Sequence, residues 1–140
     1  MSRYTVDSSV AIKWFIPESG SEFAVQLLTE DLIGPDLLFS EIGNILWKKV
    51  KRDEISEDEG HAILAAFSRG RIEIHSSAST QLLYSAFAIA NEAEISLYDA
   101  LYVSLATLDG SLLVTADRKL VRRLEKSRFG PHVVFLEALP

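Results

Sequence analysis

The chain has 140 residues, a formal net charge of −6 and 48% hydrophobic residues, which suits one compact domain spanning residues 1–140. It contains no cysteine, which excludes disulfides, thiol nucleophiles and cysteine-ligated zinc. No apolar run approaches the ~18 residues of a membrane span, and Asp7 and Lys13 interrupt the N-terminal segment. We therefore expect a soluble cytoplasmic protein without a signal peptide.

The cations are concentrated in two parts of this acidic chain. Ten of the fourteen Lys and Arg residues fall in two clusters, Lys48, Lys49, Lys51 and Arg52, and Arg118, Lys119, Arg122, Arg123, Lys126 and Arg128. The net charge argues against non-specific nucleic-acid binding. The clusters are either solvated helix faces or a track for phosphate groups beside an acidic pocket.

The first half of the chain predicts alternating strands and helices. A strand at 4–6 stops at Asp7, and a short helix follows at 8–15. The later elements are a helix with the apolar face Phe23, Ala24, Leu27 and Leu28, a strand at 32–33 ended by Gly34-Pro35, a long amphipathic helix at 38–50, and a helix that begins at a Ser56–Glu59 capping box, buries Ile63, Ala66 and Phe67, and ends at a left-handed Gly70.

The second half continues the same alternation. Its expected elements are a strand at 71–74, a helix carrying Leu82, Leu83, Ala86, Phe87 and Ala90, a helix capped by Ser96, a strand at 112–115, a basic helix at 119–126 and a strand at 133–136. Short continuous apolar runs separated by helices predict an α/β fold, with a mainly parallel sheet of four to five strands and helices on both faces.

Two of the predicted strands lead into an aspartate. Asp7 follows the first strand directly, and Asp117 follows the strand at 112–115 after one intervening residue. Ligands of open α/β sheets gather at the carboxyl ends of the strands. The two carboxylates converge if these strands are neighbours, which the sequence alone does not show.

Two further acids, Glu41 and Asp99, lie near the starts of predicted helices. Each of the four acids also has a structural interpretation. Asp7 and Asp117 can cap the helices that follow them, Asp99 can complete a capping box with Ser96, and Glu41 can be an ordinary surface residue. The residues taken singly leave both interpretations open.

Four segments resemble, in order and spacing, the PIN-domain ribonucleases, and among them the VapC-like toxins of toxin–antitoxin pairs. They are VDSSVAIKWF at 6–15, SEIGNIL at 40–46, SLYDALYVSLA at 96–106 and LVTADRKLVRRL at 113–124. The resemblance covers nearly the whole chain. It implies a three-layer PIN-like fold and a metal-dependent endoribonuclease that forms a homodimer and is kept inactive by a cognate antitoxin.

The family's functional residues carry over onto matching positions of this sequence. Its four acids match Asp7, Glu41, Asp99 and Asp117, its small hydroxyl residue matches Thr115, and a frequent asparagine matches Asn44. Many members have a further acid where this chain has Lys119. The resemblance also implies a hydrophobic groove for the antitoxin, for which Trp14 and Trp47 are candidate residues.

The implied reaction explains why carboxylates are needed. Phosphodiester hydrolysis requires charge neutralisation, a hydroxide and a stabilised leaving alkoxide, which a bound Mg²⁺ or Mn²⁺ can supply. We assign Asp7 and Asp99 as direct ligands, Asp117 as a direct or water-mediated ligand, and Glu41 as a ligand or the residue that orients the attacking water. Ser8 and Thr115 are expected to donate hydrogen bonds to the ligands, and Asn44 to orient Glu41 or a water.

Two other classes of protein compete with this assignment. A PIN-fold module that binds protein or RNA without cleaving it would keep the fold; the presence of all four acids argues against it, and the missing acid at Lys119 leaves it open. A phosphoryl-transferring α/β protein is less compatible, because a phosphatase of that kind needs an acid where Ser9 stands. The three histidines, His61, His75 and His132, lack the spacing of metal ligands.

Overall fold

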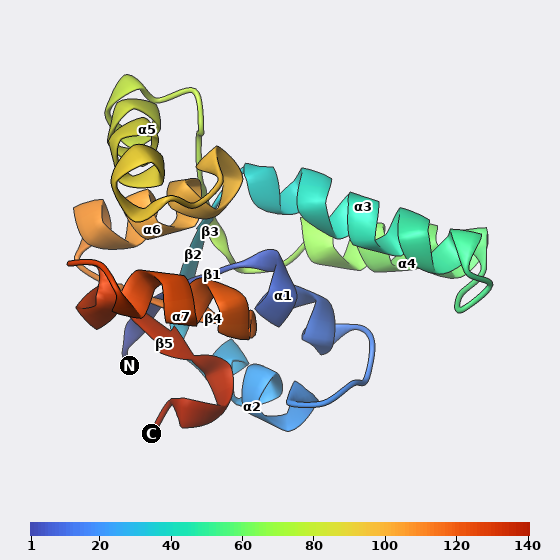
Figure 1. Cartoon of the computed structure of the whole chain (residues 1–140). Coiled ribbons are helices and arrows are strands. Elements are labelled where there is room, and N and C mark those ends of the chain that lie inside the picture. The colour runs from blue at the N-terminus through green and yellow to red at the C-terminus, as the bar shows by residue number, and fades with distance from the viewer.

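The computed structural model describes residues 1–140 and contains one five-stranded parallel sheet in the order β3-β2-β1-β4-β5 (Figure 1). The strands are β1 (Arg3–Val6), β2 (Asp31–Pro35), β3 (Glu73–His75), β4 (Leu112–Thr115) and β5 (Val133–Phe135). All four strand pairs are parallel, which confirms the predicted α/β fold.

Helices separate the strands along the chain. They are α1 (Ser8–Ala11), α2 (Ser21–Gln26), α3 (Leu37–Lys51), α4 (Glu57–Ser68), α5 (Thr80–Ala93), α6 (Leu97–Asp109) and α7 (Arg118–Glu125), with 3₁₀ turns η1 (Ile12–Trp14), η2 (Leu27–Thr29), η3 (Gly130–His132) and η4 (Leu136–Ala138). None of these helices is long and apolar enough to span a membrane.

The sheet divides the apolar core into two layers. Alternate side chains of a strand point to opposite faces, so Ile33 and Leu113 join a large core with α3, α5 and α6. Val6, Leu32 and Val114 join a smaller core with α1, α2 and the C-terminal turn. Helix α6 contacts β1, β2 and β4, and α5 packs on α6. Helices therefore cover both faces, as the sequence predicts.

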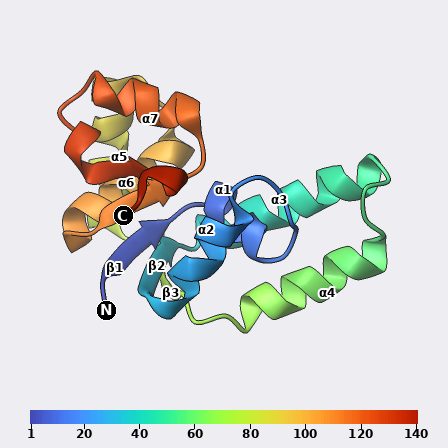
Figure 2. The same ribbon diagram turned by 90° about the horizontal axis from the view of Figure 1, so that it is seen from below.

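Helices α3 and α4 form an arm that projects away from the sheet (Figures 1 and 2). The predicted capping box begins α4, because Ser56 accepts a hydrogen bond from the Glu59 backbone and Glu59 accepts one from the Ser56 backbone. The base of the arm is anchored by Phe67, whose ring meets those of Phe15 and Phe39 edge-on. The arm thus holds α3 beside α1, at one end of the sheet.

Two predicted breaks in the chain are wrong. Gly34 and Pro35 do not interrupt the strand after Ile33 but belong to β2 and pair with β3, through the registers Gly34–Ile74 and Pro35–His75. The pairing of β1 with β2 ends at Ile33, so the missing Pro35 N–H removes no bond on that side. A Cβ on Gly34 would lie 2.2 Å from Leu38 Cδ1, which explains the glycine.

The left-handed ending predicted at Gly70 is also wrong. Helix α4 ends at Ser68, and Gly70 has no positive φ, whereas Gly110 at the end of α6 has φ +80°. The strand expected at 71–74 begins at Glu73, where the pairing with β2 starts.

Two apolar side chains lie outside the faces expected for them. Leu28 is 52% exposed because α2 gives way at Leu27 to a 3₁₀ turn, whose tighter pitch rotates Leu28 off the buried face. Phe87 is 65% exposed because α5 buries the stripe formed by Leu82, Ala86 and Ile89.

Candidate active site

Strands β1 and β4, which lead into Asp7 and Asp117, are neighbours in the sheet. Val6 of β1 lies beside Val114 of β4, so Asp7 and Thr115 emerge side by side. The strand order reverses here, since β2 lies on one side of β1 and β4 on the other. Such a switch point opens a crevice at the carboxyl ends of the strands. The structure therefore supplies the adjacency that the sequence left open.

Asp7 is held by hydrogen bonds in a buried position. Its side chain is 7% exposed and caps α1 by accepting from the Val10 N–H at 3.3 Å. Ser9 Oγ donates to Oδ1 at 2.5 Å, and Thr115 Oγ1 donates to Oδ2 at 2.5 Å. Burial raises the pKa of Asp7 from 3.8 to about 6, although these hydrogen bonds oppose the rise.

Ser9 is a residue of this site that the sequence reasoning missed. Its Oγ accepts the Ala116 N–H at 2.8 Å while donating to Asp7, and it lies 3.3 Å from Thr115 Oγ1. A hydroxyl can donate once and accept twice, so one serine joins the start of α1 to the end of β4. Its place two residues after a strand-ending aspartate was the available signal.

Glu41 accepts two side-chain hydrogen bonds from other elements. Tyr102 of α6 donates its hydroxyl to Glu41 Oε1, and Ser8 Oγ donates to the same oxygen at 3.3 Å. Tyr102 is 1% exposed, and burial together with the nearby carboxylates Glu41, Asp7 and Asp99 holds the pKa of its hydroxyl well above the usual range. The predicted contact of Ser8 is present.

The expected contact of Asn44 with Glu41 is not formed. Asn44 is exposed on α3, and the hydrogen-bond donors to Glu41 are Ser8 and Tyr102 instead. The sequence alone assigns Tyr102 no role in the site. Its partner on α3 is 61 positions away, so no local spacing could reveal it.

Asp99 and Asp117 complete the acidic group. The Asp99 N–H donates to Ser96 Oγ at 3.1 Å, and Asp117 Oδ1 caps α7 by accepting from the Lys119 and Leu120 backbones at 3.0 and 3.2 Å. Burial, followed by repulsion from Asp117 and Glu41, raises the pKa of Asp99. Asp117 therefore caps α7 and also belongs to the acidic group.

The four acids form an open group rather than a closed cage. Repulsion from Asp99 also contributes to the raised pKa of Asp7, and repulsion from Asp117 and Glu41 contributes to that of Asp99, so Asp99 lies near the other three acids. No three His, Cys, Asp or Glu side chains converge closely enough to hold one metal ion. Mg²⁺ usually keeps several waters and binds through one or two carboxylates, so this set of oxygen donors suits it.

Both cation clusters contribute to hollows that border the acidic group. A hollow of about 350 Å³ is lined by Asp99, Asp117, Lys119 and Arg123. A second, of about 400 Å³, extends from Ser9 and Ala116 to the cations Lys13, Lys48, Lys49 and Arg52. The group of four acids, called the acidic centre below, therefore lies beside two hollows that are lined by positive charge.

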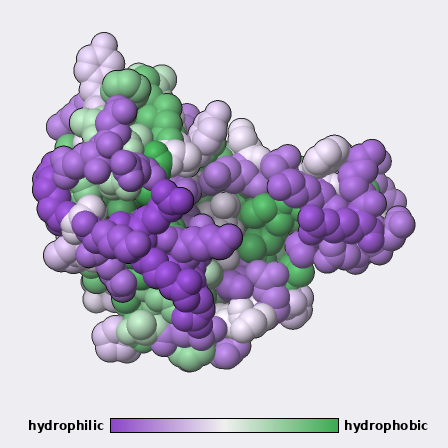
Figure 3. All heavy atoms as spheres, in the orientation of Figure 1, coloured by the Kyte–Doolittle hydropathy of each residue, from purple (hydrophilic) through white to green (hydrophobic).

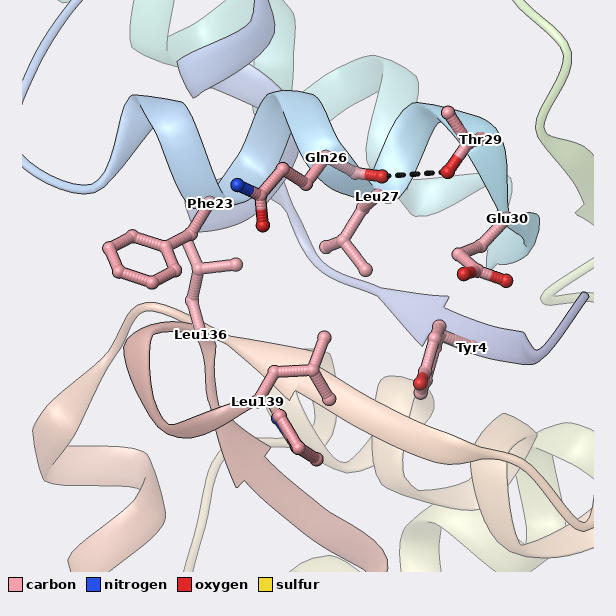
Figure 4. Close-up of a pocket in the computed structure, with 9 residues that line it drawn as sticks. Tyr4, Phe23, Gln26, Leu27, Thr29, Glu30, Leu136 and Leu139 are labelled. Atoms are coloured by element: carbon pink, nitrogen blue, oxygen red, sulfur yellow. Dashed lines mark hydrogen bonds between the residues drawn. The ribbon is translucent and has the colours of Figure 1, made fainter.

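Two other hollows lie away from the acids. One of about 260 Å³ separates η2 from the C-terminal turn, where Leu27 faces Leu136 and Leu139 and Tyr4 closes one end (Figure 4). A larger apolar hollow, of about 770 Å³, is lined by Trp14, Phe15 and Phe67 among others. None of the four acids lines either of them.

The two tryptophans expected in one groove are separated. Trp14 lines the apolar hollow and donates its indole N–H to the Ala24 carbonyl at 2.7 Å. Trp47 does not line that hollow; it is 56% exposed on α3, with Lys51 Nζ 5.8 Å from its ring centroid. The two side chains therefore do not line this hollow together, and their role in a groove for the antitoxin stays a prediction.

Relatives of known name share most of this chain. Ribonuclease VapC3 of Pyrobaculum aerophilum is 34% identical over 125 residues, which cover 86% of this chain and 94% of that protein. Ribonuclease VapC1 of Mycobacterium tuberculosis is 30% identical over 122 residues, which cover 86% of this chain and 90% of that protein.

Solved structures show the same fold at lower identity. A crystal structure of a Pyrobaculum aerophilum protein aligns with a TM-score of 0.72 and 22% identity, over 97% of this chain and 85% of that one. DNA-bound VapBC from Salmonella typhimurium aligns with a TM-score of 0.71 and 17% identity, over 97% of this chain and 99% of that one. Residues 4–126 match the PIN domain family. Because this match spans most of the chain, and Asp7 and Asp117 follow the carboxyl ends of β1 and β4, the chain belongs to the PIN-domain family.

Proposed function

We propose that this protein is a divalent-metal-dependent endoribonuclease and the toxin of a toxin–antitoxin pair. The curated relatives that it matches along most of its length are named as ribonucleases of the VapC type. The observation that carries the proposal is the buried Asp7 carboxylate. It is held by two hydroxyls at a switch point of the sheet, and the charge of Asp99 acts on it.

The acids are proposed to have different roles in binding a cation and a water. Asp7 and Asp99 are the proposed direct ligands, and Asp117 binds directly or through a water. A bound Mg²⁺ or Mn²⁺ supplies charge neutralisation at the phosphate, an ionised water and stabilisation of the leaving oxygen. Raised pKa values of Asp7 and Asp99 support this assignment, because a cation relieves the cost of burying and crowding their charges.

The surrounding hydroxyls hold the acids in position. Thr115 and Ser9 each donate to one oxygen of Asp7 and so fix the orientation of its carboxylate. Tyr102 and Ser8 hold Glu41, which is proposed to bind the cation or orient the attacking water. Asn44 contacts no acid here, and its proposed role is limited to a water on the exposed side of α3.

An antitoxin and a second copy of the chain are the proposed protein partners. Solved relatives of the same fold include a toxin–antitoxin complex from Klebsiella pneumoniae and DNA-bound VapBC from Salmonella typhimurium. An acidic centre in a chain of net charge −6 suits a partner that presents a basic side chain. An antitoxin that inserts such a side chain would compete with the metal.

The decisive experiment replaces Asp7 and Asp99 separately by Asn and measures RNA cleavage by the pure protein in Mg²⁺ and Mn²⁺. We expect each variant to lose at least about a hundredfold in kcat, since each removes a charged ligand. Asp58→Asn is the matched control, because Asp58 is exposed on the α3–α4 arm.

The outcomes separate the two leading functions. Full activity in a folded Asp7→Asn or Asp99→Asn variant would reject the ligand assignment. A wild-type protein that binds RNA but never cleaves it would identify a binding module instead. Growth arrest on expression of the wild type, relieved by Asp7→Asn, would support the toxin role.

A further inference from the structure

The hollow between α1–η1 and α3 adjoins the acidic centre through Ser9, which donates a hydrogen bond to Asp7, and cations line the rest of its polar wall together with Glu18. Its inner end is formed by Ser9 and Ala116, which are linked by a hydrogen bond next to Asp7. Its outer end is lined by Lys48 and Lys49 of α3 and by Arg52, the residue that follows the last turn of α3. A ligand that enters this hollow from the acidic centre therefore meets positive charge as it leaves.

The spacing along α3 places these cations in line with an acid of the centre. Glu41, Ile45, Lys48 and Arg52 share one face of the helix, at i, i+4, i+7 and i+11. At 1.5 Å per residue, Lys48 lies about 10 Å and Arg52 about 16 Å beyond Glu41. The face thus changes from negative to positive over a few turns.

Two of these cations have no anionic partner within the protein. Lys49 pairs with Glu54 at 3.5 Å, and Lys13 pairs with Glu18 at 3.0 Å. Lys48 and Arg52 form no ion pair and are exposed. On the face shown in Figure 3, hydrophilic side chains cover α7 and the far end of the arm, with an apolar area between them.

We propose that a single-stranded RNA backbone leaves the acidic centre through this hollow, and that Lys48 and Arg52 bind its phosphates on one side of the scissile bond. This proposal rests on the proposed ribonuclease function. A polyanion suits this hollow because Lys48 and Arg52 attract the phosphates that flank the scissile bond. The acidic centre itself repels a phosphate unless a cation is bound there. Both cations would bind the substrate away from the reacting atoms, since neither forms a hydrogen bond or ion pair with Asp7, Asp99 or Glu41 in this structure.

The test is the double variant Lys48→Glu with Arg52→Glu, assayed for cleavage of single-stranded RNA at several salt concentrations. We expect KM to rise about tenfold or more with kcat within about twofold, because only binding is altered. The slope of log KM against log salt should fall by about 1.4, since each phosphate contact on single-stranded RNA contributes about 0.7. Arg52→Lys should retain most of the binding.

The matched control is Arg69→Glu with Arg71→Glu, which changes the net charge equally. Both arginines are exposed and border the apolar hollow lined by Trp14, at the opposite end of the strands from Asp7. The control should keep the wild-type KM and salt slope. Equal effects of the two double variants would show that net charge alone matters and would overturn the proposal.

A second readout measures binding without turnover. Labelled single-stranded RNA is titrated with Asp99→Asn protein, with and without the Lys48 and Arg52 reversals, and binding is followed by anisotropy. Unchanged affinity would overturn the RNA path even if wild-type cleavage is confirmed. Absence of wild-type cleavage would instead reject the ribonuclease function. Polyglutamate binding that the reversals weaken, with RNA binding unaffected by them, would assign the hollow to an acidic peptide and overturn the RNA path.

Discussion

The hydroxyl of Tyr102 on α6 donates a hydrogen bond to Glu41 Oε1 on α3, across 61 positions of the sequence. The tyrosine ring is buried in the larger core, so the position of its hydroxyl is set by packing. Ser8 donates to the same oxygen from the start of α1. Three separate helices therefore determine where the Glu41 carboxylate lies.

We expect Tyr102→Phe to lower kcat about tenfold with little change in the fold. The ring keeps its packing, but Glu41 loses a charge-assisted hydrogen bond worth about 1.5–3 kcal/mol, part of which Ser8 and water can replace. Steady-state kinetics and thermal unfolding measure the two effects. Tyr84→Phe is the control, because Tyr84 is 71% exposed and should change neither quantity. Wild-type kcat in Tyr102→Phe would show that Glu41 needs no such support.

Asp7→Asn should stabilise the metal-free protein at pH 8. The pKa of Asp7 is raised from 3.8 to about 6 in the folded state, so between these values the folded chain binds more protons than the unfolded chain. The ionised carboxylate therefore destabilises the fold above about pH 6, and this cost disappears as the pH falls toward 4. The asparagine amide fits these hydrogen-bond donors imperfectly, so we expect the free energy of unfolding at pH 8 to rise by about 1–3 kcal/mol.

Chemical unfolding in EDTA at pH 8 and pH 4 measures this gain. The two proteins should differ at the higher pH and become similar at the lower one. Adding Mg²⁺ should stabilise the wild type more than Asp7→Asn, because only the carboxylate gains from the cation. A constant difference at all pH values would mean that Asp7 does not titrate as described.

Thr115→Val should weaken metal-dependent activity and raise the pKa of Asp7 further, whereas Thr115→Ser should preserve both. Valine has nearly the shape of threonine but cannot donate to Asp7 Oδ2 or accept the Asp117 N–H at 3.1 Å. Serine keeps the hydroxyl. Carbon-detected NMR titration of the metal-free protein reports the pKa, and Mg²⁺ titration of activity reports the affinity. Equal behaviour of the two variants would assign Thr115 a packing role only.

Arg3→Ala should lower the melting temperature without changing kcat. Arg3 binds Asp31, Glu73 and Asp109 at 2.9, 2.8 and 3.0 Å, at the end of the sheet opposite Asp7. Removing the cation leaves three neighbouring carboxylates, and salt should reduce the penalty by screening them. Because Arg3 lowers the pKa of Asp109, the difference from wild type should also shrink as acid protonates these groups. A loss of kcat at unchanged stability would contradict this purely structural role.

Local features of the fold could be predicted because they depend on near neighbours in the chain. The Ser56–Glu59 capping box needs residues three apart, and the buried strand at 112–115 is a continuous apolar run. The same rules failed at Gly34, where pairing with β3 outweighs the local tendency to turn. They also failed at Gly70, where the chain leaves α4 without a left-handed residue.

The sequence by itself determined the alternation of strands and helices, and it placed the four acids at strand ends and helix starts. Only the tertiary structure decided that β1 lies beside β4, that Ser9 bonds to the end of β4, and that Tyr102 reaches Glu41. The reason is physical: hydrophobic period and capping act over a few residues, whereas strand order and helix packing are chosen by burial of the whole core.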